Sequence, residues 1–225
     1  MMEVYVKAKP GTSGKVLGDC PFSHRVLLTV VEKKVPYVAK FIDFEQKPEW
    51  FLDAFPQGNV PVIRDGEGNW LADSDLICER LETMFPEPSL VPASEGTKEV
   101  GKSLFGAFVK YITNKEPEKE DDLKQSLLAE VSSLNTHVEA NQAKGLDFLD
   151  SRPAVCSVDL ALYPKLKHVC VVLSHYKGLE IRKGYGGIQA FMDNFEIKRE
   201  TEATFYPDEY ILEGWKPKVG ISSKM

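Results

Sequence analysis

Hydrophobic and polar positions divide the chain into two halves with different periodicities. In the first half, short alternating or continuous apolar runs predict strands over residues 4–8, 37–44, 60–63 and 70–71. Helical spacing predicts helices that begin at Cys20-Pro21, span 48–55, and run from Asp73-Ser74 to about residue 84. The expected order of elements is βαβαββα.

Beyond residue 85 the pattern predicts helices and no strands. Residues 86–93 are rich in proline and are expected to form a linker. Residues 115–122 are charged, contain a proline and are expected to be a solvated loop. The predicted organisation is an α/β domain over 1–85, the linker, and an all-helical domain over 94–225. Its helices are expected over 98–111, 122–143, 159–175 and 187–198.

Composition narrows the possible functions. The 225 residues are 43% hydrophobic and 28% charged, as in an ordinary globular protein, and the net charge of -6 argues against a nucleic-acid partner. We expect no membrane span, because apolar runs are far shorter than the ~20 residues that one needs. The four cysteines and four histidines are scattered, which predicts a reducing compartment and no metal site.

One cysteine, Cys20, could be reactive because it lies at the start of a predicted helix. Unpaired N–H groups at a helix N-terminus stabilise a thiolate, which is the reactive form of the side chain. Three residues after Cys20 stands Ser23 rather than a second cysteine. An oxidised Cys20 therefore needs an external thiol to reduce it. From this motif alone, a buried structural cysteine is an equally good interpretation.

Two further features follow in order. Pro61 comes after Val60 at a strand start, where a cis bond could turn a backbone edge outward. Asp73-Ser74 is a helix N-terminus that could receive a carboxylate. A strand-start proline and a helix cap are ordinary features when each stands alone. Their succession after a βαβ unit is much less common.

These features resemble the glutathione transferase superfamily, and the wider sequence resembles plant-type dehydroascorbate reductases. The likeness lies in residues 18–29 (GDCPFSHRVLLT), 32–37 (EKKVPY), 47–52 (KPEWFL) and 214–219 (GWKPKV). It implies a thioredoxin-like N-terminal domain that binds glutathione, followed by a helical domain. The implied reaction is a ping-pong reduction of dehydroascorbate by two glutathiones, with no permanently bound cofactor. It also favours a monomer, and the reducing compartment that the cysteines indicate leads us to expect a cytoplasmic protein.

The resemblance assigns residues as well. Cys20 matches the nucleophile, and Asp19 is expected to handle substrate or a proton, since a carboxylate opposes formation of a neighbouring thiolate. Lys9 competes with Lys7 for the family's lysine role. The implied glutathione contacts are Lys7, Asp19, Lys47, Val60, Pro61, Asp73 and Ser74. The implied ascorbate-side residues are Lys7, Asp19, His168 and Trp215.

Three points depart from this picture or leave it open. Cys156 replaces the usual Ser or Thr three residues before Asp159, which puts that helix cap in doubt. An omega-like glutathione transferase or thioltransferase, and a non-enzymatic chloride-intracellular-channel-like protein, are alternative functions. The C-terminal Ser223-Lys224-Met225 resembles a peroxisomal address, although a frayed tail is the simpler interpretation.

Overall fold

The computed structural model describes residues 1–197 and 204–220, so Ser223-Lys224-Met225 lies outside the described residues. The chain forms two compact units. Met1–Leu90 and residues 204–210 belong to the first, and residues 91–197 and 211–220 belong to the second. The boundary between the units falls between residues 90 and 91, within the segment 86–93 that the sequence predicts to be a linker. Residues 204–210, near the far end of the chain, group with the first unit.

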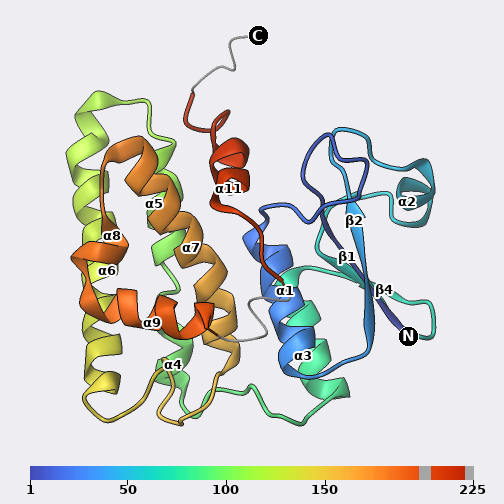
Figure 1. Ribbon diagram of the computed structural model, residues 1–225, viewed down its shortest axis with the longest axis horizontal. Coiled ribbons are helices and arrows are strands. Elements are labelled where there is room, and N and C mark those ends of the chain that lie inside the picture. The colour runs from blue at the N-terminus through green and yellow to red at the C-terminus, as the bar shows by residue number, and fades with distance from the viewer. Residues whose placement is uncertain (198–203, 221–225) are drawn as a thin grey trace. The chain divides into compact units, whose positions relative to one another are not determined.

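The first unit contains a four-stranded mixed sheet and three helices in the predicted order βαβαββα (Figure 1). The strands lie in the order β2-β1-β3-β4, with β2 parallel to β1 and both other neighbouring pairs antiparallel. The elements are β1 (Met2–Lys7), α1 (Pro21–Glu32), β2 (Tyr37–Ile42), α2 (Glu49–Ala54), β3 (Val62–Arg64), β4 (Trp70–Ala72) and α3 (Ser74–Met84).

Alternation along β1 builds a core on each face of this sheet. Val4 and Val6 point to the face that α1 and α3 cover, where they join a buried cluster with Val26 and Ile77. Tyr5 points to the opposite face. There it joins a second cluster with Ile42, Phe51 and Val62, so α2 covers that face through Phe51. Both faces are buried, which fixes the register of the strands.

A buried lysine, Lys33, caps the end of α1. The Lys33 side chain is fully buried, and its ammonium pairs with Glu82 at 2.7 Å. The same ammonium donates to the carbonyl oxygens of Phe85 at 2.7 Å and Pro88 at 3.0 Å. Because an ammonium has three donors, all of them are used. Lys33 thus anchors the segment that follows α3 to the end of α1.

The second unit is helical, as predicted (Figure 1). Its elements are α4 (Glu95–Glu99), α5 (Leu104–Ile112), a 3-10 helix (Pro117–Lys119), α6 (Glu120–Gln142), α7 (Ser157–Lys177), α8 (Ile181–Gly184) and α9 (Gly186–Glu196). The helix α11 (Asp208–Trp215) begins in the first unit and ends in this one. None of the helices in the described ranges is long and apolar enough to cross a membrane.

Several sequence-based boundaries are wrong in this unit. The helix predicted over 98–111 is two helices, because Gly101 adopts a φ of 67° and lies against Leu162. The loop predicted over 115–122 contains the 3-10 helix and the first turn of α6. The helices α8 and α11 were not predicted. Each miss involves a short element or a break that depends on tertiary contact.

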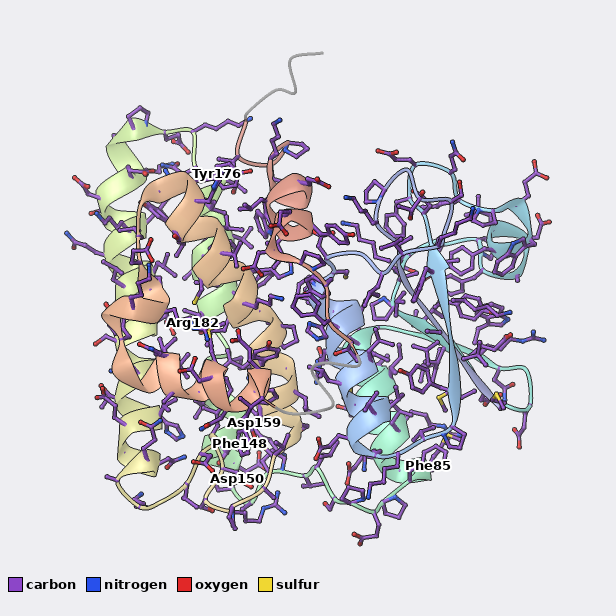
Figure 2. The ribbon with its side chains drawn as sticks, in the orientation of Figure 1. Phe85, Phe148, Asp150, Asp159, Tyr176 and Arg182 are labelled. Atoms are coloured by element: carbon purple, nitrogen blue, oxygen red, sulfur yellow. The ribbon has the colours of Figure 1, made fainter. Side chains whose placement is uncertain are left out.

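The N-terminus of α7 is capped in spite of the cysteine at the cap position. Asp159 accepts from the backbone N–H of Cys156 at 2.8 Å, and also from the N–H of Leu149 at 2.8 Å. The doubt that the sequence raised about this cap is therefore resolved in favour of a cap. Figure 2 labels Asp159 together with Phe148 and Asp150 at this end of the unit.

Candidate active site

The strand register brings the ends of several elements to one edge of the sheet. Tyr5 of β1 lies opposite Val62 of β3, so Lys7 at the end of β1 is level with Val60. Val62 pairs in turn with Ala72, so Asp73 follows β4 at the same edge. The end of β2 is also there, because Lys7 pairs with Ile42 in parallel register. Lys7, Val60-Pro61 and Asp73-Ser74 therefore share one edge.

A short loop carries the chain from β1 back to this edge before α1 begins. The backbone N–H of Gly18 donates to the carbonyl oxygen of Lys7 at 2.8 Å. A Cβ atom on Gly18 would stand 2.4 Å from the carbonyl oxygen of Ala8, so glycine is required at this close approach. Asp19 and Cys20 follow immediately and are held at the sheet edge.

Lys7 and Lys9 have different partners. The Lys7 ammonium pairs with the Asp19 carboxylate, whose residue is only 6% exposed. The Lys9 ammonium lies over the ring of Tyr210, 4.1 Å from its centroid. Of the two lysines that the sequence left in competition, Lys7 is the one beside Asp19 and Cys20.

Cys20 is the N-cap of α1 and is partly exposed. Its Sγ atom accepts from the backbone N–H of Ser23 at 3.5 Å, and Pro21 occupies the first helical turn. The Ser23 hydroxyl accepts in turn from the Lys7 backbone N–H at 3.3 Å, which ties the first turn of α1 to the sheet. The sulfur thus meets one of the N–H groups at the start of the helix, the kind of donor that can stabilise a thiolate.

The other three thiols are in different surroundings. Cys78, Cys156 and Cys170 are buried. Burial raises the pKa of the Cys78 thiol and, together with the Asp159 carboxylate, that of Cys156, so both stay protonated at neutral pH. Cys20 is therefore the cysteine that both solvent and helix geometry favour as a nucleophile.

The remaining predicted glutathione-side residues surround this edge. The Val60–Pro61 bond is cis. Asp73 caps α3 by accepting from the N–H groups of Asp75 at 2.8 Å and Leu76 at 3.2 Å. Those two donors are therefore occupied, and Ser74 supplies the hydroxyl and N–H that remain at this helix start.

Lys47 lies in the loop between β2 and α2. Its ammonium is 4.5 Å from the centroid of the Phe44 ring. It also lies against Gly58, since a Cβ atom on that residue would be 3.4 Å from Nζ. Because Gly58 stands two residues before Val60, the structure places the Lys47 cation beside the segment that leads to the cis-proline.

His168 and Trp215 lie in the second unit, where they bond to each other. The indole Nε1 donates to His168 Nδ1 at 2.9 Å, and the two residues are 1% and 4% exposed. The rings of Phe105 and Phe108 meet Trp215 edge-on. Because an indole N–H can only donate, His168 Nδ1 carries no proton in this bond.

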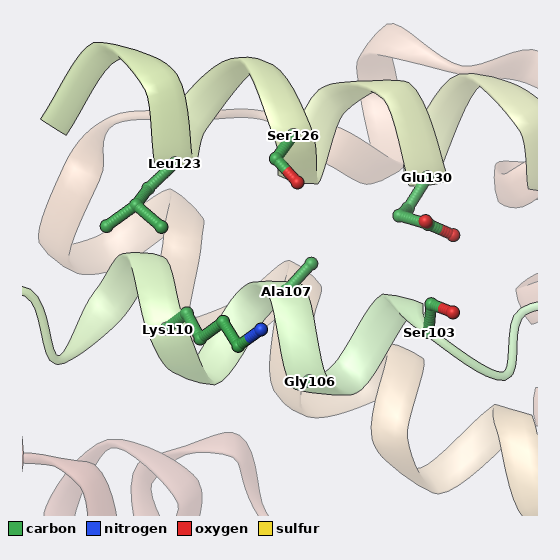
Figure 3. Close-up of a pocket in the computed structure, with 7 residues that line it drawn as sticks. All are labelled: Ser103, Gly106, Ala107, Lys110, Leu123, Ser126 and Glu130. Atoms are coloured by element: carbon green, nitrogen blue, oxygen red, sulfur yellow. The ribbon is translucent and has the colours of Figure 1, made fainter. Parts of the chain in front are cut away.

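The second unit also has a surface groove, with a volume of about 360 Å³, between α5 and α6 (Figure 3). None of its lining residues is a predicted site residue, and it contains no thiol. It is lined by Ser103, Gly106, Ala107, Lys110, Leu123, Ser126 and Glu130. Within the described ranges, no group of three His, Cys, Asp or Glu side chains could hold a metal ion.

A mixed sheet with a cysteine at the start of its first helix, followed in the chain by helices, defines a glutathione-transferase type of protein. Residues 19–84 match the family model for the glutathione S-transferase N-terminal domain. A rice protein, "Probable glutathione S-transferase DHAR1, cytosolic", is 39% identical over 97% of this chain and 98% of its own. "Glutathione S-transferase DHAR2" from Arabidopsis thaliana is 37% identical with the same coverage.

A solved structure agrees. Chlamydomonas reinhardtii dehydroascorbate reductase superposes with a TM-score of 0.84 at 33% identity, covering 96% of this chain and 98% of that one. The chain belongs to the dehydroascorbate reductase (DHAR) branch of the glutathione S-transferase family. Human chloride intracellular channel protein 3 is more distant, at 26% identity over 97% of both chains.

Proposed function

We propose that this chain reduces dehydroascorbate to ascorbate at the expense of two glutathiones, with Cys20 as the nucleophile. One observation carries the proposal. The partly exposed thiol caps α1 in a chain that aligns end to end with proteins that bear this name. A thiolate so placed can attack an oxidised substrate, whereas the buried thiols cannot.

The electrons and atoms balance in three steps. The Cys20 sulfur gives two electrons to dehydroascorbate and takes up oxygen from water, which leaves ascorbate and a sulfenic acid. A first glutathione then displaces that oxygen as water and forms a mixed disulfide. A second glutathione attacks the disulfide, regenerating the Cys20 thiolate and releasing glutathione disulfide. Because Ser23 is no thiol, glutathione supplies both resolving sulfurs.

Glutathione would lie along the sheet edge beside Cys20. We assign the backbone of Val60, before the cis-Pro61, to pair with the peptide of glutathione as an added strand segment. The Ser74 hydroxyl and N–H would take the γ-glutamyl carboxylate, since Asp73 already occupies the next two N–H groups. The Lys47 ammonium lies beside the approach to Val60 and would bind the other carboxylate.

Asp19 and Lys7 would serve the oxidised substrate. The two side chains form a largely buried ion pair, and Asp19 directly precedes Cys20 in the chain. Lys7 offsets the negative charge that Asp19 would otherwise place beside a thiolate. The pair can hold a hydroxyl of dehydroascorbate and transfer a proton as ascorbate leaves. His168 and Trp215 remain our proposed ascorbate-side residues.

The decisive test is Cys20→Ser. We expect glutathione-dependent dehydroascorbate reduction, followed by ascorbate absorbance, to fall by at least about a thousandfold, as for loss of a catalytic nucleophile. The melting temperature should stay close to that of the wild type. Cys170→Ser is the matched control and should keep its activity, because that thiol is buried. An active Cys20→Ser variant would contradict the proposal.

A second assay separates the omega-like alternative from this proposal. The ratio of kcat/KM for dehydroascorbate to that for a mixed disulfide of glutathione should exceed one for the reductase. A ratio well below one identifies a thioltransferase. We also propose a cytoplasmic monomer. The rice relative is named cytosolic, and light scattering of the purified chain tests the oligomeric state.

A further inference from the structure

A segment from the far end of the chain is built into the first unit next to α1. Residues 204–210, here called the C-terminal strap, group with Met1–Leu90 by contact. In Figure 1 the strap runs from the start of α11 along the N-terminal part of α1. No pattern in the sequence of residues 204–210 predicts that this segment packs against α1.

His24 fixes the strap to α1 through both nitrogens of its ring. Nε2 is 2.9 Å from the Thr204 hydroxyl, and Nδ1 is 3.2 Å from the Tyr206 hydroxyl. The Tyr206 ring also meets the imidazole edge-on, with 5.0 Å between centroids. A hydroxyl can donate or accept, so a neutral imidazole is satisfied in either tautomer. All three residues are 1–2% exposed.

Lys9 holds the other end of the strap. Its ammonium lies over the Tyr210 ring, and Lys9 itself belongs to the loop between β1 and Cys20. The backbone N–H of Lys9 donates to the carbonyl oxygen of Val16 at 2.8 Å, which fixes this loop. The strap is therefore attached to both chain segments that flank Cys20. One is the loop before it, and the other is the helix α1 after it.

The residue that holds the strap follows Cys20 by one helical turn. The His24 backbone N–H donates to the Cys20 carbonyl at 2.9 Å, which closes the first turn of the helix. Residues four apart on a helix share one face, so the His24 side chain lies one turn below the sulfur. Between the buried Thr204 and Tyr206, the Phe205 side chain is 61% exposed. Asp208 and Glu209 of the strap are exposed as well.

We propose that His24 is a positioning residue for the Cys20 site, and that the strap it holds limits the size of the thiol and disulfide partners that reach the sulfur. This inference rests on the proposed role of Cys20 as nucleophile. A wall built from a small hydrogen-bonded segment would admit glutathione and exclude bulkier partners, such as disulfides on the surfaces of proteins.

The test compares a small and a bulky reagent at the same sulfur. Iodoacetamide and N-(1-pyrenyl)maleimide are reacted with the native protein, and modification of Cys20 is followed by mass spectrometry. His24→Leu removes both hydrogen bonds, and Tyr206→Phe removes one but keeps the ring. We expect the ratio of bulky to small rate constants to rise about fivefold in Tyr206→Phe and further in His24→Leu. A factor of about five corresponds to one buried hydrogen bond.

Two variants separate positioning from simple loss of stability. His24→Gln can still bond to one hydroxyl and should restore most of the wild-type ratio. His137→Leu, which removes a histidine bond to the Leu149 carbonyl at 2.8 Å in the second unit, should leave the ratio unchanged. In steady state, His24→Leu should raise KM for glutathione more than it lowers kcat, because the nucleophile itself is intact.

An unchanged ratio in folded His24→Leu and Tyr206→Phe would overturn the inference. If His24→Leu fails to fold, Tyr206→Phe alone decides, since it deletes a single oxygen. The proposed function fails in a different way. In that case Cys20 of the wild type reacts no faster with iodoacetamide than a free thiol does, and dehydroascorbate is not reduced.

Discussion

Each cysteine sulfur of this chain has its own chemical surroundings. The Cys20 sulfur accepts from the Ser23 N–H at the start of α1, while Cys78 contacts the Thr29 hydroxyl at 3.4 Å inside the first unit. Cys170 lies against the sulfur of Met192 at 3.6 Å. A buried thiol packs as a small apolar group, whereas Cys20 is partly exposed. The same residue type thus stands in two different environments.

The bond between Trp215 and His168 allows a test at the same scale. Trp215→Phe keeps an aromatic ring among Phe105 and Phe108, and removes the indole N–H together with part of the ring system. If the pair only packs, the variant loses about 2–4 kcal/mol of stability, for the lost hydrogen bond and the cavity, and keeps its KM for dehydroascorbate. Our assignment expects KM for dehydroascorbate to rise several-fold, with KM for glutathione unchanged. Steady-state kinetics and thermal unfolding distinguish these outcomes.

Among the elements, α7 depends on a carboxylate at its first turn. Asp159 uses one oxygen for the Cys156 N–H and the other for the Leu149 N–H, so it both caps the helix and fixes the preceding loop. Its burial raises its pKa, which means that the ionised form is costly inside the unit. The hydrogen bonds from the two N–H groups partly offset this cost of burying the carboxylate.

Asp159→Asn should therefore destabilise the protein even though it is nearly isosteric. An amide offers one acceptor oxygen, and its NH2 group must face the second N–H, so we expect a loss of about 2–3 kcal/mol in urea unfolding. Ser94→Ala is the matched control. It removes an ordinary cap, in which Ser94 accepts from Thr97 at 3.2 Å, and should cost about 1 kcal/mol. Equal losses in the two variants would argue against the double role.

On the scale of the whole molecule, acid stability depends on the charges that the fold buries. Asp150 is fully buried, which by itself raises its pKa. Arg152 at 2.8 Å and the backbone N–H groups of Ala93 and Ser151 outweigh that effect and hold its pKa below the usual value. A depressed carboxyl pKa adds stability above the unfolded pKa of about 4, and this stability is lost as pH falls through the folded pKa.

Asp150→Asn should thus lower the melting temperature at pH 7 and flatten its pH dependence. The expected loss at neutral pH is about 2 kcal/mol, the usual contribution of hydrogen bonds to a charged group. Melting curves between pH 3 and pH 7 for the wild type and the variant give the measurement. Parallel curves over this range would show that Asp150 does not contribute to acid sensitivity.

Much of the first unit could be predicted from sequence because its signals are local. The apolar spacing after Pro21 and the cap at Asp73 correctly located α1 and α3. The alignment of Lys7, Val60 and Asp73 at one edge follows from strand order, which no local pattern contains. The break at Gly101 was missed, since a positive φ there depends on its tertiary surroundings.

Some residues of the candidate site could be predicted from sequence and others could not, again because only local signals are visible there. Cys20 stands out because a helix start is visible in sequence. The pairing of Lys7 with Asp19, and of Lys9 with Tyr210, required coordinates. His24 was overlooked as a functional residue. Its partners lie 180 and 182 positions further along the chain, where sequence periodicity carries no information.

That separation has a consequence for the order in which the chain folds. During synthesis from the N-terminus, the sheet and helices of residues 1–90 emerge long before Thr204 and Tyr206. Closing so long a loop has an entropic cost that only later contacts repay. The first unit can therefore assemble early, but the ring nitrogens of His24 stay open to water until Thr204 and Tyr206 have also left the ribosome.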